Sequence, residues 1–370
     1  MKRLVLLGGG HAQVQVIKAF GADPPPDTAV VLINRSRFTP YSGMLPGLIA
    51  GHYTHADSHI DLARLCARAN VIFIEQEAVA LDLDRGEVRC AEGRTERYDI
   101  LSVDTGSTPP LDPVPGAREH ALPVKPIERF LAQTAALTEQ CAAPGEHSIV
   151  LVGGGAAGFE VMLALAYRVS RKPSRSAAVA YHWVTDTPQV LPTFPARVRQ
   201  RALRITDRWH VRVHTGARVG RVTAAGAELS NGTRIVATHV VWATGAQPAS
   251  MFARAGLRTD AHGFIAVDAT LRSLSHPNVL ASGDVASVIE HPRPKAGVFA
   301  VRQGPALTRN LRLALAGRKP LPFVPQQRFL VILSAGERYA IASRGRFAVE
   351  GCWVWTWKDW IDRRFMQRFA

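Results

Sequence analysis

The glycine-rich stretch at residues 4–10 is the feature that most constrains the fold. Four apolar residues precede three glycines, and such a run is too short for a helix but typical of a strand buried on both faces. Residues 14–20 then have helical spacing. Gly8 permits the tight turn, and Gly10 lets the backbone approach a pyrophosphate at the helix N-terminus. Gln13 replaces the third glycine of the G-x-G-x-x-G pattern, so this stretch alone leaves an ordinary glycine-rich turn open.

The same arrangement returns at residues 149–160. Gly153, Gly155 and Gly158 complete the pattern there, and a helical run follows at residues 161–169. Two such loops in one chain imply two bound dinucleotides, and a flavin with a nicotinamide is the commonest pair. The repeat therefore favours an electron-transfer protein.

Two strands that end in Thr-Gly extend the repeat. Residues 98–107 contain Thr105 and Gly106, and residues 239–246 contain Thr244 and Gly245. We expect each strand to close over the dinucleotide of its own half, because the pieces recur in the same order.

Alternation of apolar and polar residues predicts short antiparallel strands at residues 71–83, 86–90 and 95–103. A further strand at residues 278–286 stops at Gly283 and Asp284. We expect Asp284 to accept a hydrogen bond from a ribityl hydroxyl, and a cap on the next helix is the alternative.

The first half contains further candidates for the flavin site. An apolar strand at residues 28–33 ends at Asn34, where this fold usually has an acidic residue for the adenosine ribose. Residues 37–51 mix Gly and Pro with apolar residues, which indicates an ordered loop near a flat ligand, with a surface turn as the alternative. The predicted flavin-binding residues are Gly8, Gly10, His11, Ala12, Asn34, Arg35, Pro40, Ser42, Thr105, Gly106, Gly283 and Asp284.

The composition narrows the partners. The chain has 370 residues, enough for two or three domains, and a net charge of +15 spread along its length. It carries no nucleic-acid motif, so we expect an anionic membrane surface rather than nucleic acid as a partner. Residues 149–167 are the longest apolar segment, but their glycines and Glu160 favour a strand and a helix over a membrane span. No secretory leader is evident, which predicts the cytoplasm, with contact at the inner face of the cell membrane left open.

The cysteines argue against sulfur chemistry. Four are present, at Cys66, Cys90, Cys141 and Cys352, and none forms a C-x-x-C pair or a metal-binding spacing. We therefore expect no metal site, no disulfide reduction through a dithiol, and single buried thiols at all four positions.

The C-terminal stretch at residues 352–369 is rich in aromatic and basic residues. If this stretch is a helix, one side is largely aromatic and consists of Trp353, Trp357, Trp360, Ile361 and Phe365. The charged residues Lys358, Asp359, Asp362 and Arg363 then lie elsewhere on the helix. Such a helix is typical of a membrane interface, and burial on its own domain or at a dimer contact stays open. Before it, residues 329–347 predict a hairpin that turns at residues 335–337, which makes a small third domain.

These motifs together resemble a known family. The paired glycine loops, the two Thr-Gly strands and Thr270 with Gly283 and Asp284 are similar to the two-dinucleotide-binding flavoproteins, the pyridine nucleotide–disulfide oxidoreductase superfamily. Within that superfamily, a chain without a cysteine pair resembles the branch of type II NADH dehydrogenases and ferroptosis-suppressor-like quinone reductases. Residues 41–47 and 357–366 look closest to the FAD-dependent oxidoreductase found alone or fused ahead of selenide, water dikinase.

The resemblance covers essentially the whole chain and implies an α/β fold. That fold has two Rossmann-like, three-layer ββα dinucleotide-binding domains and a small C-terminal α+β domain. The implied division is residues 1–122 and 249–320 for FAD, 123–248 for NAD(P)H, and 321–370 for the C-terminal domain.

The resemblance also implies roles for individual residues. NAD(P)H is expected on Gly153, Gly155, Gly158, Asp186, Thr244 and Gly245. Asp186 would accept from the ribose 2′-hydroxyl and repel a 2′-phosphate, which favours NADH.

Three charged residues are the candidates for catalysis. Glu160 would lie near the nicotinamide and the flavin and relay a proton, or be a carboxylate that the helix dipole favours. Lys125 and Lys295 are candidates to stabilise an anionic reduced flavin or an acidic acceptor, with solvated lysines as the alternative.

We therefore predict an FAD-dependent NAD(P)H oxidoreductase, either monomer or homodimer. Hydride passes from the nicotinamide to flavin N5, and electrons then pass to a small acceptor, with a quinone favoured. Val298 and Arg302 stand where quinone-reducing relatives have glutamines, which is a departure from that branch. Oxidation of sulfide or a selenium compound with help from Cys352, and a flavin-bearing redox sensor, remain as alternatives.

Overall fold

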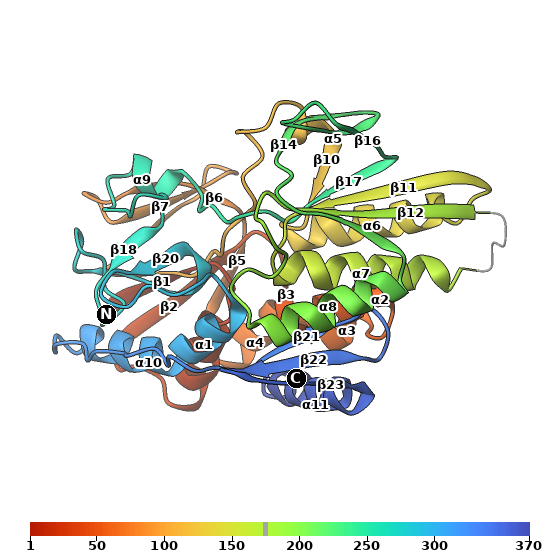
Figure 1. Ribbon diagram of the computed structural model, residues 1–370. Coiled ribbons are helices and arrows are strands. Elements are labelled where there is room, and N and C mark those ends of the chain that lie inside the picture. Colours follow the sequence, from red (N-terminus) through yellow and green to blue (C-terminus); the bar gives the residue numbers. More distant parts are fainter. Residues whose placement is uncertain (173–176) are drawn as a thin grey trace.

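Two five-stranded parallel sheets organise the chain, of which the computed structural model describes residues 1–172 and 177–370. In Figure 1 the first sheet lies on the left and the second on the right. The first has the order β19 (Val279–Ala281), β9 (Ile100–Val103), β1 (Lys2–Leu7), β2 (Thr28–Asn34) and β5 (Ile72–Glu75). The second has the order β10 (Ala121–Pro123), β17 (His239–Trp242), β11 (Gly145–Val152), β12 (Ala177–Val184) and β13 (Val211–His214). The predicted internal repeat is confirmed, because each glycine loop follows the middle strand of its sheet.

Each parallel sheet is covered by a three-stranded antiparallel sheet on one face and by helices on the other. The antiparallel sheets are β6 (Ala78–Asp82), β7 (Glu87–Cys90) and β8 (Thr95–Arg97), and β14 (Val219–Thr223), β15 (Gly226–Leu229) and β16 (Arg234–Val236). The helices are α1 (Gln13–Ala22), α4 (Leu62–Arg68) and α10 (Gly297–Leu315), and α6 (Ile127–Gln140), α7 (Ala156–Ser170) and α8 (Ala196–Arg208). This is the three-layer α/β fold that the sequence predicts.

Alternate residues of β11 show how the layers are held together. Ile149 and Leu151 belong to the core under the helices, whereas Val150 and Val152 belong to the core under the antiparallel sheet. A strand buried on both faces needs apolar residues at every position, which explains its continuous hydrophobic run.

The expected antiparallel strands at residues 71–83 and 95–103 are partly wrong. Residues 71–83 form two strands, of which β5 joins β2 in parallel and only β6 joins the antiparallel sheet. Residues 95–103 likewise divide into antiparallel β8 and parallel β9. All four residues of β9 are buried, because the strand lies between β1 and β19 inside the sheet.

Residues 37–51 are more regular than the expected loop. They contain β3 (Phe38–Pro40), the 3-10 turn η1 (Ser42–Met44) and α2 (Leu45–Ala50). Pro46 stands in the first turn of α2, where its fixed φ suits a helix start, and Ile49 and Ala50 are buried in the core around α7. α3 (His55–Ser58) and β4 (His59–Asp61) follow.

Short elements connect the two halves and lead to the C-terminal domain. They are α5 (Ala117–His120), α9 (Met251–Arg254), β18 (Ile265–Val267), η2 (Gly283–Val285) and β20 (Ala286–Val288). β10, at the predicted entry to the NAD(P)H domain, pairs with β17 of the second sheet, and β19 returns to the first. The domain boundaries themselves stay a prediction.

The C-terminal domain lies at the bottom of Figure 1. It consists of β21 (Val331–Ser334), β22 (Ala340–Arg344), β23 (Phe347–Gly351) and α11 (Cys352–Met366). The predicted hairpin is confirmed as β21 and β22, and β23 adds a third antiparallel strand that the sequence analysis missed.

The orientation of α11 differs from the predicted single aromatic side. Trp353, Trp357 and Trp360 are 58%, 38% and 56% exposed, but Phe365 is buried. The buried side also contains Val354, Trp355, Lys358 and Asp362. Lys358 faces inward because its ammonium pairs with Asp362 and donates to the Gly43 carbonyl.

Two further expectations can be compared with the fold. Residues 149–167 form the end of β11 and most of α7, as predicted, and none of the described helices has the length and hydropathy needed to cross a membrane. Cys66, Cys90 and Cys141 are buried as expected, whereas Cys352 is exposed at the first residue of α11.

Candidate active site

The first glycine loop is shaped by contacts between β1, α1 and the end of β9. Gly8 has φ +94°, and a Cβ there would lie 2.6 Å from the Asp104 carbonyl oxygen. A Cβ on Gly10 would overlap the Asp104 carboxyl group. Side chains at these two positions would therefore push β9 away from the loop.

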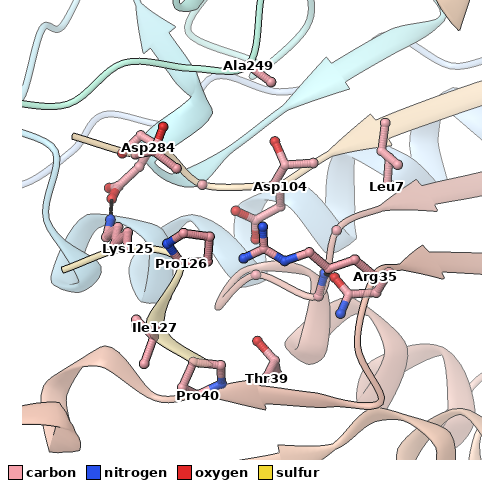
Figure 2. A pocket seen from close by; sticks show the side chains of 18 of the residues that line it. Leu7, Arg35, Thr39, Pro40, Asp104, Lys125, Pro126, Ile127, Ala249 and Asp284 are labelled. Carbon is pink, nitrogen blue, oxygen red and sulfur yellow. Dashed lines mark hydrogen bonds and ion pairs between the residues drawn. The ribbon is translucent and has the colours of Figure 1, made fainter. Parts of the chain in front are cut away.

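A cavity of about 360 Å³ opens at the carboxyl ends of β1, β2 and β9 (Figure 2). Its walls contain all the predicted flavin-binding residues except Ala12 and Gly283. Ala12 is buried beneath the loop, and Gly283 faces a second cavity. Lys125, a predicted catalytic residue, also lines the first cavity, beside Asp284.

Asn34 holds the glycine loop through its amide. Its Oδ1 accepts a hydrogen bond of 2.8 Å from the Gly9 amide, and its Nδ2 donates to the Ser36 carbonyl. The side chain thus occupies the strand-end position of the usual acidic residue without adding a negative charge.

His11 and Ser42 meet on another wall of the cavity. The Ser42 amide lies 3.3 Å and its hydroxyl 3.1 Å from His11 Nε2. Because the amide can only donate, Nε2 is an acceptor and the ring carries its proton on Nδ1. Burial lowers the His11 pKa to about 4, so the ring is neutral at pH 7.

Asp104 is a cavity residue that the sequence analysis missed. Its Oδ2 accepts hydrogen bonds from the amides of Ala12, at 2.9 Å, and Gln13, at 3.2 Å. Burial raises the pKa of this carboxyl group to about 7. A comparison of the two Thr-Gly strands would have found it, because the matching residue before Thr244 is Ala243.

The second glycine loop has the same construction at the end of β11. Gly153 has φ +131°, and a Cβ there would lie 2.6 Å from the Ala243 carbonyl oxygen. A Cβ on Gly158 would overlap the Gly153 carbonyl, whereas a Cβ on Gly155 would meet no described atom within 4 Å. This open space over the start of α7 is suited to the approach of a ligand's phosphates, and Thr244 and Gly245 follow β17 alongside.

Asp186 is displaced from the position that the pattern expects. The Gly153 amide bonds to the Val184 carbonyl just as the Gly8 amide bonds to the Ile33 carbonyl, which makes Thr185 the counterpart of Asn34. Asp186 is exposed one residue further on.

Glu160 is mostly buried on α7 and faces the C-terminal domain. Its Oε1 accepts a hydrogen bond of 2.8 Å from the Ser334 amide of β21. Burial raises its pKa to about 7, against the opposing effect of the nearby Lys358 ammonium. The carboxyl group therefore exchanges its proton near neutral pH.

Lys295 lies in the second cavity, of about 430 Å³, which shares Asp284 and Ala300 with the first. Its ammonium is 3.8 Å from the centre of the Phe264 ring and donates to the Ala286 carbonyl. Burial lowers its pKa. The Lys295 side chain is thus held by Phe264 and the Ala286 carbonyl rather than solvated, and it does not line the first cavity.

The first cavity is suited to an elongated dinucleotide. It extends from Arg35 beside β2 to Lys125 and Asp284 (Figure 2), and Asn34 and the glycine loop also line it. This loop before α1 is the usual place for a pyrophosphate, and acceptors for sugar hydroxyls lie at both ends.

Two parallel sheets, each with a glycine loop after its middle strand, define a protein that binds two dinucleotides. Residues 2–304 match the model of the family described as pyridine nucleotide-disulphide oxidoreductase. The chain belongs to this family. It is an enzyme, a flavin-dependent oxidoreductase whose cofactors are FAD and NAD(P)H.

Relatives agree with this assignment. An NADH dehydrogenase-like protein of Mycobacterium tuberculosis is 26% identical over 302 residues, which span 78% of this chain and 73% of that protein. An NADH dehydrogenase-like protein of Bacillus subtilis is 23% identical over 340 residues, or 90% of each chain.

Solved structures show the same fold. The sulfide:quinone oxidoreductase of Aquifex aeolicus has a TM-score of 0.83 at 20% identity, and the match covers 100% of this chain and 91% of that chain. NDH2 from Plasmodium falciparum in complex with NADH has a TM-score of 0.81 at 14% identity, with 98% and 97% covered.

Proposed function

We propose that this enzyme transfers electrons from NADH through FAD to a quinone at a membrane surface. The observation that carries the proposal is the position of α11. Its exposed side presents Trp353, Trp357 and Trp360, and on its other side Phe365 stacks on Tyr41 with ring centres 4.5 Å apart. Tyr41 in turn lies 5.2 Å from His11 in the wall of the flavin cavity.

The surface around α11 supports contact with an anionic membrane. The guanidinium of Arg364 lies over the Trp360 ring, and α8, which packs on β22 of the small C-terminal sheet as α11 does, carries five arginines. Tryptophan and arginine together favour the boundary between lipid headgroups and acyl chains, and the net charge of +15 has the right sign. An apolar quinone dissolved in the membrane would then reach the enzyme on the α11 side.

Each predicted catalytic residue has a defined task in this proposal. Bound FAD supplies the redox chemistry, accepting hydride from NADH and returning electrons to the acceptor. Lys125 provides positive charge at the cavity wall and holds Asp284 in place. Lys295 holds the adjoining segment against Phe264. Glu160 exchanges a proton near pH 7, as an acid or base for the reduced acceptor requires.

Relatives with quinone in their names also favour this acceptor. The sulfide-quinone reductase of Aquifex aeolicus is 25% identical over 177 residues, which span 47% of this chain and 41% of that protein. Val298 and Arg302 remain a departure from the glutamines of the quinone branch, so the acceptor has to be tested directly.

The test combines flavin reduction with membrane binding. Under anaerobic conditions NADH should bleach the flavin rapidly, and a short-chain quinone should reoxidise it with or without vesicles. Replacing Trp353, Trp357 and Trp360 together with Ser should abolish sedimentation with anionic vesicles and slow the reduction of a vesicle-bound quinone, while NADH still bleaches the flavin. Val236→Ser is the matched control, since Val236 is 76% exposed in the distant β16. A flavin that NADH reduces but no quinone reoxidises would refute the acceptor.

A further inference from the structure

Asp104 places a carboxyl group where a ligand's phosphates are expected. It follows β9 directly and is 3% exposed, between Gly10 on one side and Gly283 on the other. A Cβ on either glycine would overlap this carboxyl group. The side chain is therefore enclosed, and it accepts the amides of Ala12 and Gln13 at the start of α1.

The charges around Asp104 do not neutralise it. Lys125 is paired with Asp284 at 2.9 Å, and Arg35 lies 3.6 Å from Glu128. The neighbouring His11 is neutral at pH 7. The charged groups that line the cavity with Asp104 include Asp284 of η2, Lys125 after β10, and His11 and Arg35 of the loops after β1 and β2. Behind Gly283, Gln303 of α10 accepts a hydrogen bond from the Gly283 amide, and Ser282 after β19 is buried.

The second half of the chain lacks this group. Ala243 precedes Thr244 there, and its carbonyl packs on Gly153 as the Asp104 carbonyl packs on Gly8. Because Ala243 takes the place of Asp104, this position supplies no carboxyl group to the amides at the start of α7. Asp104 therefore has no counterpart at the matching position of the second half.

We propose that Asp104 couples FAD binding to the uptake of a proton. The ionised carboxylate satisfies the amides at the start of α1 in the unliganded protein, and the protonated acid is the form that tolerates the pyrophosphate of FAD beside it. The proposal depends on the family's cofactor and is independent of the quinone.

The sign of the coupling follows from charge repulsion. The carboxyl pKa is already about 7 without the cofactor, and the negative charges of a pyrophosphate nearby raise it further. FAD binding therefore takes up a proton between the two pKa values. Affinity should be highest below pH 7 and fall by up to about tenfold per pH unit as the pH rises through that interval.

The test measures the release of FAD from the purified holoprotein. Free FAD, detected by its fluorescence after dilution and equilibration, should change little below about pH 7 and increase steeply from there to about pH 8.5 in the wild type. Asp104→Asn keeps the shape of the side chain without the titration and should make release independent of pH. Asp104→Ala, which introduces the residue type found at the matching position Ala243, should also make release independent of pH.

Glu160→Gln separates Asp104 from the other buried carboxyl group with a pKa near 7. Glu160 lies outside the walls of the flavin cavity, so this variant should keep the wild-type pH dependence. Calorimetry of FAD binding to wild-type apoprotein in two buffers of different ionisation enthalpy should show net proton uptake near pH 7.5. Binding without proton uptake, or a slope that Glu160→Gln removes and Asp104→Asn retains, would overturn the proposal.

Discussion

Lys125 Nζ lies 2.9 Å from Asp284 Oδ2, although 159 positions separate the two residues in the chain. Lys125 follows the strand that enters the second sheet, and Asp284 follows the strand that returns to the first. The ion pair therefore joins the two halves at the wall of the first cavity, where Figure 2 shows it as a dashed line.

Lys125→Met should slow the reduction of the flavin by NADH by roughly 10–100-fold, because a positive charge beside the cofactor stabilises the charge that develops on it. The effect on the free energy of unfolding should be below about 1 kcal/mol, since both side chains are partly exposed. Stopped-flow absorbance measures the first and denaturant unfolding the second. Lys125→Arg keeps the charge and should retain most of the rate, and an unchanged rate in Lys125→Met would exclude the role.

Glu160→Gln should remove the pH dependence of acceptor reduction. The wild-type carboxyl group, with a pKa of about 7, is protonated at lower pH and ionised above it, so the rate of acceptor reduction should fall as the pH rises through 7. The variant should be slower by roughly 100-fold and flat with pH. Its glutamine still accepts from the Ser334 amide, so the thermal midpoint serves as the control for folding.

The stability of the protein should show the same titration. The folded-state pKa of Glu160 is raised above the ordinary value of 4.5 for a glutamate, so the folded protein binds the proton more tightly than the unfolded chain does. Its contribution to the free energy of unfolding is therefore greatest at low pH and declines by roughly 1–3 kcal/mol between about pH 4.5 and about pH 7. Denaturant unfolding of Glu160→Gln should lack this decline, and parallel curves for the two proteins would contradict the assignment.

Gly155 and Gly158 should respond differently to alanine. Gly158→Ala should lower the free energy of unfolding by about 1–3 kcal/mol, because its Cβ would overlap the Gly153 carbonyl and lie 2.9 Å from Trp183 Nε1. Gly155 has φ −86°, which alanine adopts readily, and a Cβ there would meet open space. The free energy of unfolding of Gly155→Ala should therefore stay within about 0.5 kcal/mol of the wild-type value. The substitution should instead raise the KM for NADH if phosphates approach there. Equal losses of stability would show that the space is not open.

Asp186→Ser should weaken the preference for NADH over NADPH by roughly tenfold, because it removes the repulsion between an exposed carboxylate and the 2′-phosphate. The ratio of kcat/KM for the two nucleotides is the measurement. Asp207→Ser, an acidic residue on the more distant α8, is a suitable control. An unchanged ratio would mean that Asp186, one residue beyond the expected position, does not contact the ribose.

Cys352→Ser should retain activity within about twofold, because a thiol relay needs a second sulfur within reach. Cys141 is fully buried in the core of the second half, and Cys66 and Cys90 in that of the first. Steady-state turnover with quinone and with sulfide as the alternative electron donor checks this. A loss confined to sulfide oxidation would support the sulfur-based alternative.

The repeated loops and strands could be predicted from the sequence because their signals are local. An apolar run followed by glycines defines a strand, a tight turn and a helix within about 20 residues, and it occurs twice. The strands at 72–75 and 100–103 were misassigned because alternation within one segment does not show which sheet the segment joins.

The missed features depend on residues far apart in the chain. The contact of Asp104 with the start of α1 cannot be predicted from its strand alone, although the comparison with Ala243 singles the residue out. Lys358 turns inward because the Gly43 carbonyl, 315 positions away, and Asp362 both accept hydrogen bonds from its ammonium. Periodicity on a helical wheel grouped Phe365 with the tryptophans, but stacking on Tyr41 draws it into the interior. Such choices belong to tertiary packing.

The return of the chain to the first sheet has a consequence for synthesis on the ribosome. β19 pairs with β9, yet the ribosome makes it only after the entire second sheet has been translated. The half that contains the second sheet is continuous and can mature as it emerges, whereas the half that contains the first sheet, where we propose that FAD binds, waits for residues 279–281 with one edge of β9 unpaired. Insertion of the prosthetic group should accordingly be a late event in biogenesis, and nascent chains arrested before residue 279 should not retain it.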